Sequence, residues 1–266
     1  MSLPHFYLES QVVADEGAAA FPLRLAADDA KHARVLRLAP GEHVAVVDAA
    51  RDYFECEIVA FDDNLLVVRI AQRFEDEPDR PMVVLAQGLA KGDKMDTVIR
   101  HATELGVSAF APFACERSIV KLDDRKAAAR VQRWRSIAKS AAMQSGQRAM
   151  PEVTDVGALE DLCALFAHST AVLVCWEEAP GTARIDEALE RALVQLRAGA
   201  ANARVGVVVG PEGGLTEREV DALLACNPRA SLVSLGSSIL RTETAGIVAP
   251  ALVLHELDRL ARREPR

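Results

Sequence analysis

The pattern of apolar and polar residues changes near residue 80. Before this point it is short and alternating, with apolar Phe54, Cys56 and Ile58 separated by single residues. A period of two predicts strands with one buried face, and several short strands joined by tight turns indicate a small β-barrel. The strands expected in this region cover residues 44–48, 54–59 and 65–70.

A helix and a linker complete the first region. The helix is expected to begin with Asp28 or Asp29 as its N-cap and to end near Leu38. The segment at residues 75–81 contains two prolines and no core residues, so we place a linker there. The predicted domains therefore cover residues 1–74 and 81–266.

From Met82 onward, continuous apolar runs alternate with longer amphipathic segments. Runs such as Val205-Gly-Val-Val-Val209 are typical of strands buried on both faces. Strands that alternate with helices predict an α/β domain, with a parallel sheet covered by helices on both sides. The expected strands are residues 82–86, 107–113, 171–175, 205–209 and 231–235, and the expected helices are residues 93–105 (with Gly106 as C-cap), 124–144, 183–198, 216–226 and 242–262.

Composition excludes several classes of protein. The chain of 266 residues is 50% hydrophobic and 26% charged, as in a folded protein with a sizeable core. Its longest apolar runs, such as residues 247–254, are far shorter than the roughly 18 residues of a membrane span, and its N-terminus lacks the signature of a signal peptide. Five widely spaced cysteines without a C-x-x-C pair argue against a disulfide framework and against zinc. We expect a cytoplasmic protein with no membrane partner and no metal.

The net charge of −8 conceals a basic segment. Residues 81–150 carry 12 Lys and Arg against 6 Asp and Glu, whereas the regions on either side are acidic. Screening limits each charge to roughly 8–10 Å, so a basic face can bind phosphates on an acidic protein. The basic residues lie mainly in residues 121–148. By itself this run is more often a solvated helix surface than a phosphate-binding face.

Two strand–helix junctions carry the candidate chemistry, because ligands of open α/β sheets bind at the carboxyl ends of strands. The first is Gly210-Pro-Glu-Gly-Gly214, followed by Thr216 and Glu219 in the spacing of a capping box. Its glycines let a ligand approach the backbone, or simply form a turn. The spacing matches neither G-x-G-x-x-G nor G-x-x-x-x-G-K-[ST], so NAD and ATP sites are poorly supported.

The second junction, residues 235–246, is polar and charged. It leads into the most apolar helix of the chain. Thr242 or Thr244 could cap the unpaired N–H groups of that helix. The guanidinium of Arg241 could hold a carboxylate, a phosphate or a base edge, or it could only pair with Glu212 or Glu243.

Together the two junctions resemble the cofactor loops of the SPOUT methyltransferases, and more narrowly those of the bacterial 16S ribosomal RNA uridine-N3 methyltransferases. The similarity covers nearly the whole chain. It departs from the family pattern at His101, where a lysine is common, and at Met143 and Gln147, near a usual Glu-Gln pair and arginine; the cofactor loops are intact. The matching segments are Gly210–Gly214, Leu235-Gly-Ser-Ser-Ile-Leu-Arg-Thr-Glu-Thr-Ala245, Lys91-Gly-Asp-Lys-Met-Asp96, Ala102-Thr-Glu-Leu-Gly-Val107, Pro112, Arg117-Ser118, His32, Val35-Leu-Arg37 and Gly41.

This resemblance implies an architecture that periodicity does not predict. Residues 81–266 would form a SPOUT-type α/β domain whose last strand and helix thread through a loop as a trefoil knot, a rare exception among protein folds. Residues 1–74 would form a PUA-like β-barrel that binds RNA. The resemblance also implies S-adenosyl-L-methionine as cofactor, 16S ribosomal RNA of the small subunit as partner, and a homodimer that packs the final helix against its mate.

The resemblance also implies roles for individual residues. Arg241 would stabilise the uridine anion that develops as N3 loses its proton, and Glu212 or Glu243 would orient it or accept the proton. Residues that would contact the cofactor are Val209, Gly210, Pro211, Glu212, Gly213, Gly214, Leu235, Gly236, Ile239, Leu240, Thr244 and Ala245. Residues that would contact RNA are Arg37, Lys91, Lys94, Arg117, Lys121, Arg130, Arg135 and Arg148.

Two other functions are compatible with the sequence. One keeps the knotted fold but changes the target, for instance to a ribose 2′-oxygen of another RNA. The other is an RNA-binding or ribosome-assembly module that has lost catalysis, an interpretation that the departures at Met143 and Gln147 allow.

Overall fold

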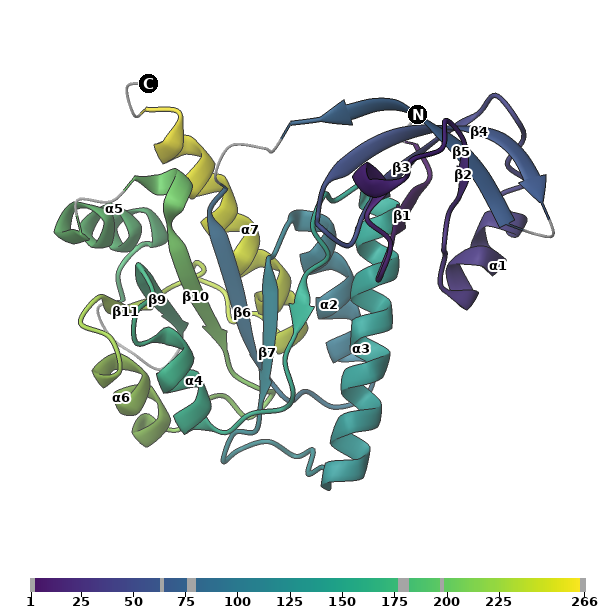
Figure 1. Cartoon of the computed structure of the whole chain (residues 1–266). Helices are drawn as coiled ribbons and strands as arrows, with labels where there is room; N and C mark the ends of the chain where they lie inside the picture. Colours follow the sequence, from purple (N-terminus) through teal and green to yellow (C-terminus); the bar gives the residue numbers. More distant parts are fainter. Residues whose placement is uncertain (1–2, 63–64, 76–79, 177–181, 197–198, 264–266) are drawn as a thin grey trace. The chain divides into compact units, whose positions relative to one another are not determined.

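The computed structural model describes residues 3–62, 65–75, 80–176, 182–196 and 199–263 (Figure 1). The chain divides into two compact units, each with its own core. The first comprises Met1–Pro78 and Ala142–Met150, and the second comprises Asp79–Ala141 and Pro151–Arg266. The inclusion of Ala142–Met150 in the first unit differs from the division made on the sequence, which had one boundary only.

The first unit is built on a five-stranded sheet in the order β1-β3-β4-β5-β2. The predicted alternation is confirmed, because Phe54, Cys56 and Ile58 are all fully or almost fully buried in its core. The strands β1 and β2 were not predicted, since two or three residues are too few to show a period. The bounds are β1 (His5–Tyr7), β2 (Phe21–Pro22), β3 (His43–Val47), β4 (Tyr53–Asp62) and β5 (Leu65–Phe74), with a 3-10 turn at Val13–Asp15.

The helix α1 (Ala27–Val35) of this unit corrects the predicted cap. Its N-cap is Ala26, without a side-chain hydrogen bond, and Asp28 and Asp29 lie in the first turn instead. Carboxylates there still interact favourably with the positive end of the helix dipole, which is why both positions read as a helix start. The helix ends before residue 38 because Arg37 adopts a left-handed conformation, with φ of 53°.

Side-chain contacts explain why residues 142–150 belong to the first unit. The hydroxyl of Tyr7 donates a hydrogen bond of 2.6 Å to the carbonyl oxygen of Gln147. The guanidinium of Arg148 lies 4.6 Å from the ring centroid of Tyr53 and 5.3 Å from that of Phe74, within the range of a cation–π interaction. Arg148, which the sequence suggested as an RNA contact, is thus engaged with aromatic rings.

The second unit contains a six-stranded, wholly parallel sheet in the order β11-β9-β10-β6-β7-β8. The predicted parallel α/β fold is therefore confirmed. Because β10 lies between β9 and β6, the loops that leave these three strands emerge side by side. The strands are β6 (Met82–Gly88), β7 (Ala109–Phe113), β8 (Glu152–Val153), β9 (Ala171–Cys175), β10 (Arg204–Val209) and β11 (Ala230–Val233).

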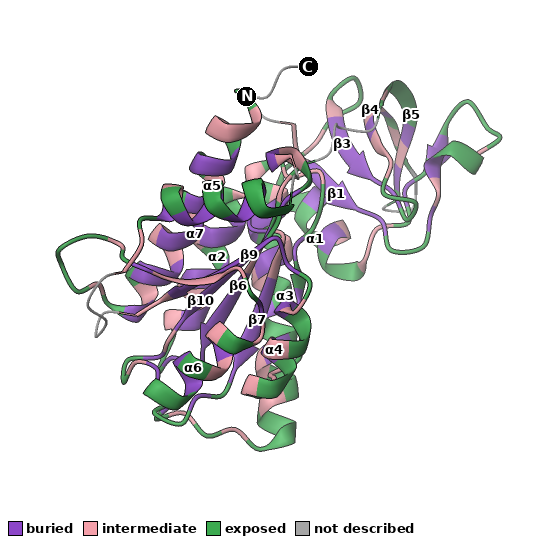
Figure 2. Cartoon of the chain, turned by 90° about the vertical axis from the view of Figure 1, so that its left-hand side faces the viewer, coloured by how far each residue is buried: buried purple, intermediate pink, exposed green. Residues whose placement is uncertain are grey.

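Helices cover both faces of this sheet, and buried residues concentrate on the strands between them (Figure 2). Residues of α2, α3, α5 and α7 share a core on one face, while residues of α4 and α6 share a core on the other. Gly106 ends α2 in a left-handed conformation, as predicted, whereas α4 and β8 were not predicted. The helices are α2 (Lys94–Leu105), α3 (Asp124–Ser145), α4 (Leu159–Phe166), α5 (Ile185–Leu196), α6 (Glu217–Ala225) and α7 (Thr242–Ala261), with a 3-10 turn at Ala200–Asn202.

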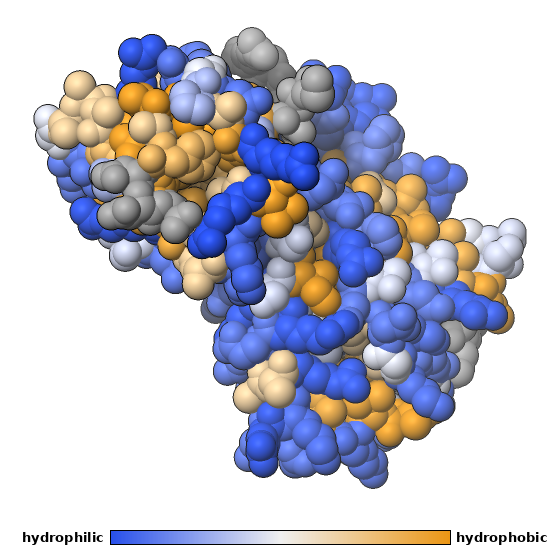
Figure 3. Space-filling model, turned by 90° about the vertical axis from the view of Figure 1, so that its right-hand side faces the viewer, coloured by the Kyte–Doolittle hydropathy of each residue, from blue (hydrophilic) through white to orange (hydrophobic). Residues whose placement is uncertain are grey.

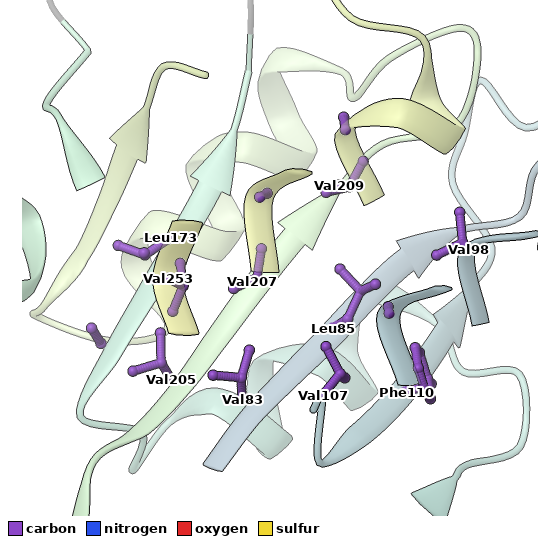
Figure 4. Close-up of a cluster of buried hydrophobic side chains, with 14 of the residues drawn as sticks. Val83, Leu85, Val98, Val107, Phe110, Leu173, Val205, Val207, Val209 and Val253 are labelled. Carbon is purple, nitrogen blue, oxygen red and sulfur yellow. The ribbon is translucent and has the colours of Figure 1, made fainter. Parts of the chain in front are cut away.

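The apolar strands explain why helices are needed on both faces. In β10, Val205, Val207 and Val209 point toward the core that includes α7, and Val208 points to the other core (Figure 4). Burial of each such side chain contributes about 1.5–3 kcal/mol. Gly206 has a packing role, since a Cβ there would lie 2.7 Å from the ring of Phe166 in α4.

Candidate functional site

A cavity of about 490 Å³ lies at the carboxyl end of the parallel sheet. Its walls are the loop after β10, the loop between β11 and α7, the first turn of α7, and residues that follow β9. The volume is typical of small-molecule sites, and the position is where open α/β sheets bind ligands.

The structure brings most of the predicted cofactor contacts together in this cavity. Among the described residues, only two of those predicted are not part of its lining, Gly213 and Thr244. Gly213 faces Arg117 instead, and the side chain of Thr244 is exposed. The predicted residues that line the cavity are Val209, Gly210, Pro211, Glu212, Gly214, Leu235, Gly236, Ile239, Leu240 and Ala245.

The loop after β10 is a compact turn pressed against the neighbouring strand. Gly214 donates its N–H to the carbonyl oxygen of Pro211 at 2.9 Å and has a φ of 69°, a conformation that favours glycine. A Cβ on Gly88, at the end of β6, would lie 2.6 Å from Pro211. Glycine at position 88 therefore allows the two backbones to approach each other at the edge of the cavity.

The capping box predicted at the start of α6 is present. The hydroxyl of Thr216 accepts a hydrogen bond from the N–H of Glu219, whose carboxylate accepts one from the N–H of Thr216. Glu219 is buried and also accepts the N–H of Glu116 at 2.8 Å. Arg117 Nη1 in turn lies 3.3 Å from the carbonyl oxygen of Gly213. The capping carboxylate thus holds the segment after β7 against the loop after β10.

The start of α7 differs from the prediction. Its N-cap is Arg241, with no side-chain cap, so neither Thr242 nor Thr244 caps the helix. Thr242 is instead the first helical residue, and its hydroxyl donates a hydrogen bond of 2.5 Å to the carbonyl oxygen of Gly210. The hydroxyl is committed to the other loop, which spacing along one helix does not reveal.

Charged residues form a cluster at the edge of the cavity. Lys94 Nζ, at the start of α2, lies 3.0 Å from Glu212 Oε1 and 3.2 Å from Glu243 Oε2. The N–H of Lys91 donates a further hydrogen bond to Glu212 Oε1, at 2.9 Å. Within the described part of the chain Arg241 forms no ion pair with either glutamate, so Lys94 takes the place considered for Arg241.

This cluster keeps both carboxylates ionised. Hydrogen bonding to Glu212, and then to Glu243, raises the pKa of Lys94 although partial burial acts against it. Burial is the largest single influence on the pKa of each glutamate and raises it, but hydrogen bonds and the charge of Lys94 together outweigh burial and lower both values. Carboxylates with lowered pKa values are weak bases, so the geometry favours an orienting role over proton acceptance.

Comparison with known proteins gives this cavity its context. The family model for an RNA methyltransferase domain matches residues 77–254. The ribosomal RNA small subunit methyltransferase E of Bacillus subtilis is 34% identical over 85% of this chain and 86% of its own length. The protein of the same name from Mycobacterium bovis is 33% identical over 92% of this chain and 88% of its own length. The chain belongs to this methyltransferase family.

The fold is also that of a solved member of the family. The ribosomal RNA small subunit methyltransferase E of Neisseria gonorrhoeae, in a crystal structure with bound S-adenosyl methionine, has a TM-score of 0.75 and 26% identity. The similarity covers 95% of this chain and 97% of that one. The RNA methyltransferase match and this likeness span the cavity and both of its loops.

Three of the methyltransferase's predicted RNA contacts lie at the cavity or against its loops: Lys94 lines it, the N–H of Lys91 donates to Glu212, and Arg117 lies against Gly213. Within the basic segment, Arg135 donates to the carbonyl oxygen of Val153 and pairs with Asp155 at 3.1 Å. Hydrophilic side chains interrupted by smaller apolar patches cover the face seen in Figure 3. The exposed or half-buried predicted contacts are Arg37, Lys91, Arg117, Lys121, Arg130, Arg135 and Arg148, whereas Lys94 lies in the cavity wall.

Sequence reasoning missed several residues of the site. Trp176 and Thr182 line the cavity, and Gln87, at the end of β6, lies buried beneath it. For Gln87 the sequence did contain a signal, because it is the polar residue in the apolar run that begins at Met82. The described residues include no helix long and apolar enough to cross a bilayer, and no group of three or more His, Cys, Asp or Glu placed to bind a metal ion.

Proposed function

We propose that this chain uses S-adenosyl-L-methionine to methylate N3 of a uridine in 16S ribosomal RNA of the small subunit. The observation that carries the proposal is the single cavity formed by the two loops of a chain that belongs to the ribosomal RNA small subunit methyltransferase E family. The Neisseria gonorrhoeae relative with bound S-adenosyl methionine supports the same cofactor here.

The chemistry of the cavity suits this cofactor. Apolar walls at Val209, Leu235 and Leu240 suit an adenine ring, and close backbone at Gly210 and Gly236 supplies peptide donors and acceptors. Lys94 is committed to Glu212 and Glu243 and is not free to hold a phosphate, which suits a cofactor that has none.

The residues of the chain would then assist transfer of the methyl group. When bound, the cofactor would supply an electrophilic methyl group for N3 of uracil, with its neutral thioether as the leaving group, and the N3 proton would pass to water. Arg241, exposed at the cavity wall, is placed to stabilise the negative charge that develops on O2 or O4. Glu212 and Glu243 would hold Lys94 and help to orient the site. Much of the rate enhancement would come from positioning.

The finer architecture is part of the same proposal. We propose that β11 and α7 thread through the loop after β10 as a trefoil knot, which the hydrogen bond from Thr242 to Gly210 supports. Residues 1–74 would form a PUA-like RNA-binding barrel, and residues 81–266 the methyltransferase domain. The exposed Leu252 on α7 supports a homodimer through this helix. The cytoplasm would be the location of this protein.

Two measurements test the proposed function. Calorimetry with S-adenosyl-L-methionine should show binding, and absence of binding at millimolar concentration would favour a non-catalytic RNA-binding module. Mass mapping of methylated nucleosides in ribosomal RNA from a deletion strain should show loss of N3-methyluridine. Loss of a ribose methyl group with N3-methyluridine intact would instead assign a 2′-O methyltransferase.

A further inference from the structure

One buried polar side chain lies where the core calls for an apolar one. In β6, Val83 and Leu85 point into the core beneath α7, and Gln87 is the next residue of the same row. It is only 1% exposed. An aliphatic side chain would fit this row by burial alone, and a buried amide is stable only if its hydrogen bonds are made. The contacts of Gln87 are therefore informative.

The amide of Gln87 joins the two loops that form the cavity. Its Nε2 donates to the hydroxyl oxygen of Thr242 at 2.9 Å and lies 3.4 Å from the carbonyl oxygen of Gly210. The hydroxyl of Thr242 donates to that same carbonyl oxygen. One carbonyl of the first loop, one hydroxyl at the start of α7 and one amide at the end of β6 thus form a closed three-membered network.

The other end of the amide shows how closely α7 approaches. Gln87 Oε1 is buried and has no hydrogen-bond partner among the described residues. A Cβ on Gly246 of α7 would lie 2.4 Å from this oxygen and 3.0 Å from a methyl group of Val98. Glycine at 246 therefore lets the helix backbone lie directly on the amide.

Anchoring of α7 does not depend on this network. Farther along the helix Ala249, Val253 and Leu257 are fully buried in the same core and hold α7 on the sheet. Besides a hydrogen bond of 3.3 Å to the carbonyl oxygen of Gly88 in its own strand, the amide contacts Gly210 and the first helical residue, Thr242, and both line the cavity. Its specific effect is to set the distance between the two loops.

We infer that Gln87 and Thr242 are positioning residues, which hold the two loops at the spacing that the cofactor requires. The inference rests on the proposed function and adds Gln87, which lies outside the cavity lining, and Thr242, which is part of it. A preformed cavity binds its ligand more tightly because less ordering is needed on binding. Loss of the network should therefore weaken cofactor binding more than it weakens the fold.

The test compares two buried amides of the full-length protein. Gln87→Leu removes the contacts of the amide with both loops and puts an apolar side chain of similar size in its place. Asn227→Leu is the matched control, because Asn227 is fully buried and donates to the carbonyl oxygens of Phe166 and Ser169, away from the cavity. We expect Gln87→Leu to raise the Kd for S-adenosyl-L-methionine about tenfold with a small change in Tm. Asn227→Leu should lower Tm and leave Kd unchanged.

A second pair of variants and a second measurement keep the inference falsifiable. If Gln87→Leu does not fold, Thr242→Val should show the same loss of affinity, and Thr242→Ser, which keeps the hydroxyl, should restore it. Hydrogen exchange of the amides at residues 210–215 should accelerate in Gln87→Leu and Thr242→Val without any cofactor. Unchanged Kd and unchanged exchange in folded variants would overturn the inference. If the unmodified protein does not bind the cofactor but exchange accelerates, the proposed function fails and the positioning role stands.

Discussion

The two junctions at the cavity and the basic segment at residues 121–148 were both singled out in the sequence, and the structure treats them differently. Residues from both junctions line one cavity. Some basic residues of the segment have unrelated partners: Arg133 pairs with Asp96, and Arg148 lies over aromatic rings. Glycines and caps constrain the backbone locally, so their spacing carries three-dimensional information. A run of charged residues predicts the sign of the local charge but not which partners the side chains contact.

The largest expected effect comes from filling the space beside Gly213. A Cβ at this position would lie 2.9 Å from the carbonyl oxygen of Arg117, so Gly213→Val must displace one of two packed segments. We expect the Kd for S-adenosyl-L-methionine to rise about a hundredfold while circular dichroism shows a folded protein. Gly17→Val is the control, since a Cβ at Gly17 has no atom within 4 Å. Normal cofactor binding by Gly213→Val would remove this loop from the site.

The next largest effect tests whether Arg241 acts in catalysis or in cofactor binding. Arg241→Ala should lower kcat about a hundredfold, because a charge that stabilises the transition state is lost, and should leave the Kd for the cofactor nearly unchanged. Arg241→Lys keeps the charge but not the planar guanidinium, so its kcat should lie between that of the unmodified protein and that of Arg241→Ala. Single-turnover methylation of ribosomal RNA and calorimetry measure these quantities separately. Equal losses in both would assign Arg241 to cofactor binding instead.

A smaller effect tests the basic segment itself. Within the described residues Lys121 and Arg130 form no ion pair, whereas Arg133 and Arg135 pair with Asp96 and Asp155. Replacing the first two by glutamine should reduce the salt dependence of RNA binding by about two phosphate contacts. Replacing Arg133 and Arg135, with the same change in charge, should reduce it less. Equal salt slopes for all variants would identify the segment as a solvated surface.

The sequence predicted elements better than it predicted contacts across elements. The helix that ends at Gly106 and the capping box of Thr216 depend on residues a few positions apart, and both are present. By contrast, the partners of Thr242 and Lys94 lie far away in the chain, so spacing assigned them wrongly or incompletely. The short strand β8 and the helix α4 were missed because neither is long enough to show a clear period.

Lys94 connects the two sides of the comparison, because it was grouped with the RNA contacts and lies in the cavity wall. Lys94→Met should remove one of the influences that lower the pKa of Glu212 and of Glu243, the others including hydrogen bonds from backbone N–H groups, so both values should rise. A carboxylate with a lowered pKa in the folded state stabilises it fully above its ordinary value of 4.5, and this stabilisation is lost as the pH falls through the lowered value. The raised pKa of Lys94 sets the opposite limit, since its contribution is complete below 10.5 and is lost at higher pH.

At neutral pH, Lys94→Met should therefore lower Tm by about 1–2 °C, and the difference should shrink in acid. Lys126→Met is the matched control, because Lys126 pairs with Asp123 on an exposed turn, where both side chains are more than half exposed. That control should change Tm less at every pH. A difference between the unmodified protein and Lys94→Met that persists in strong acid would mean that the aliphatic stem of Lys94, rather than its charge, holds the two loops to α2.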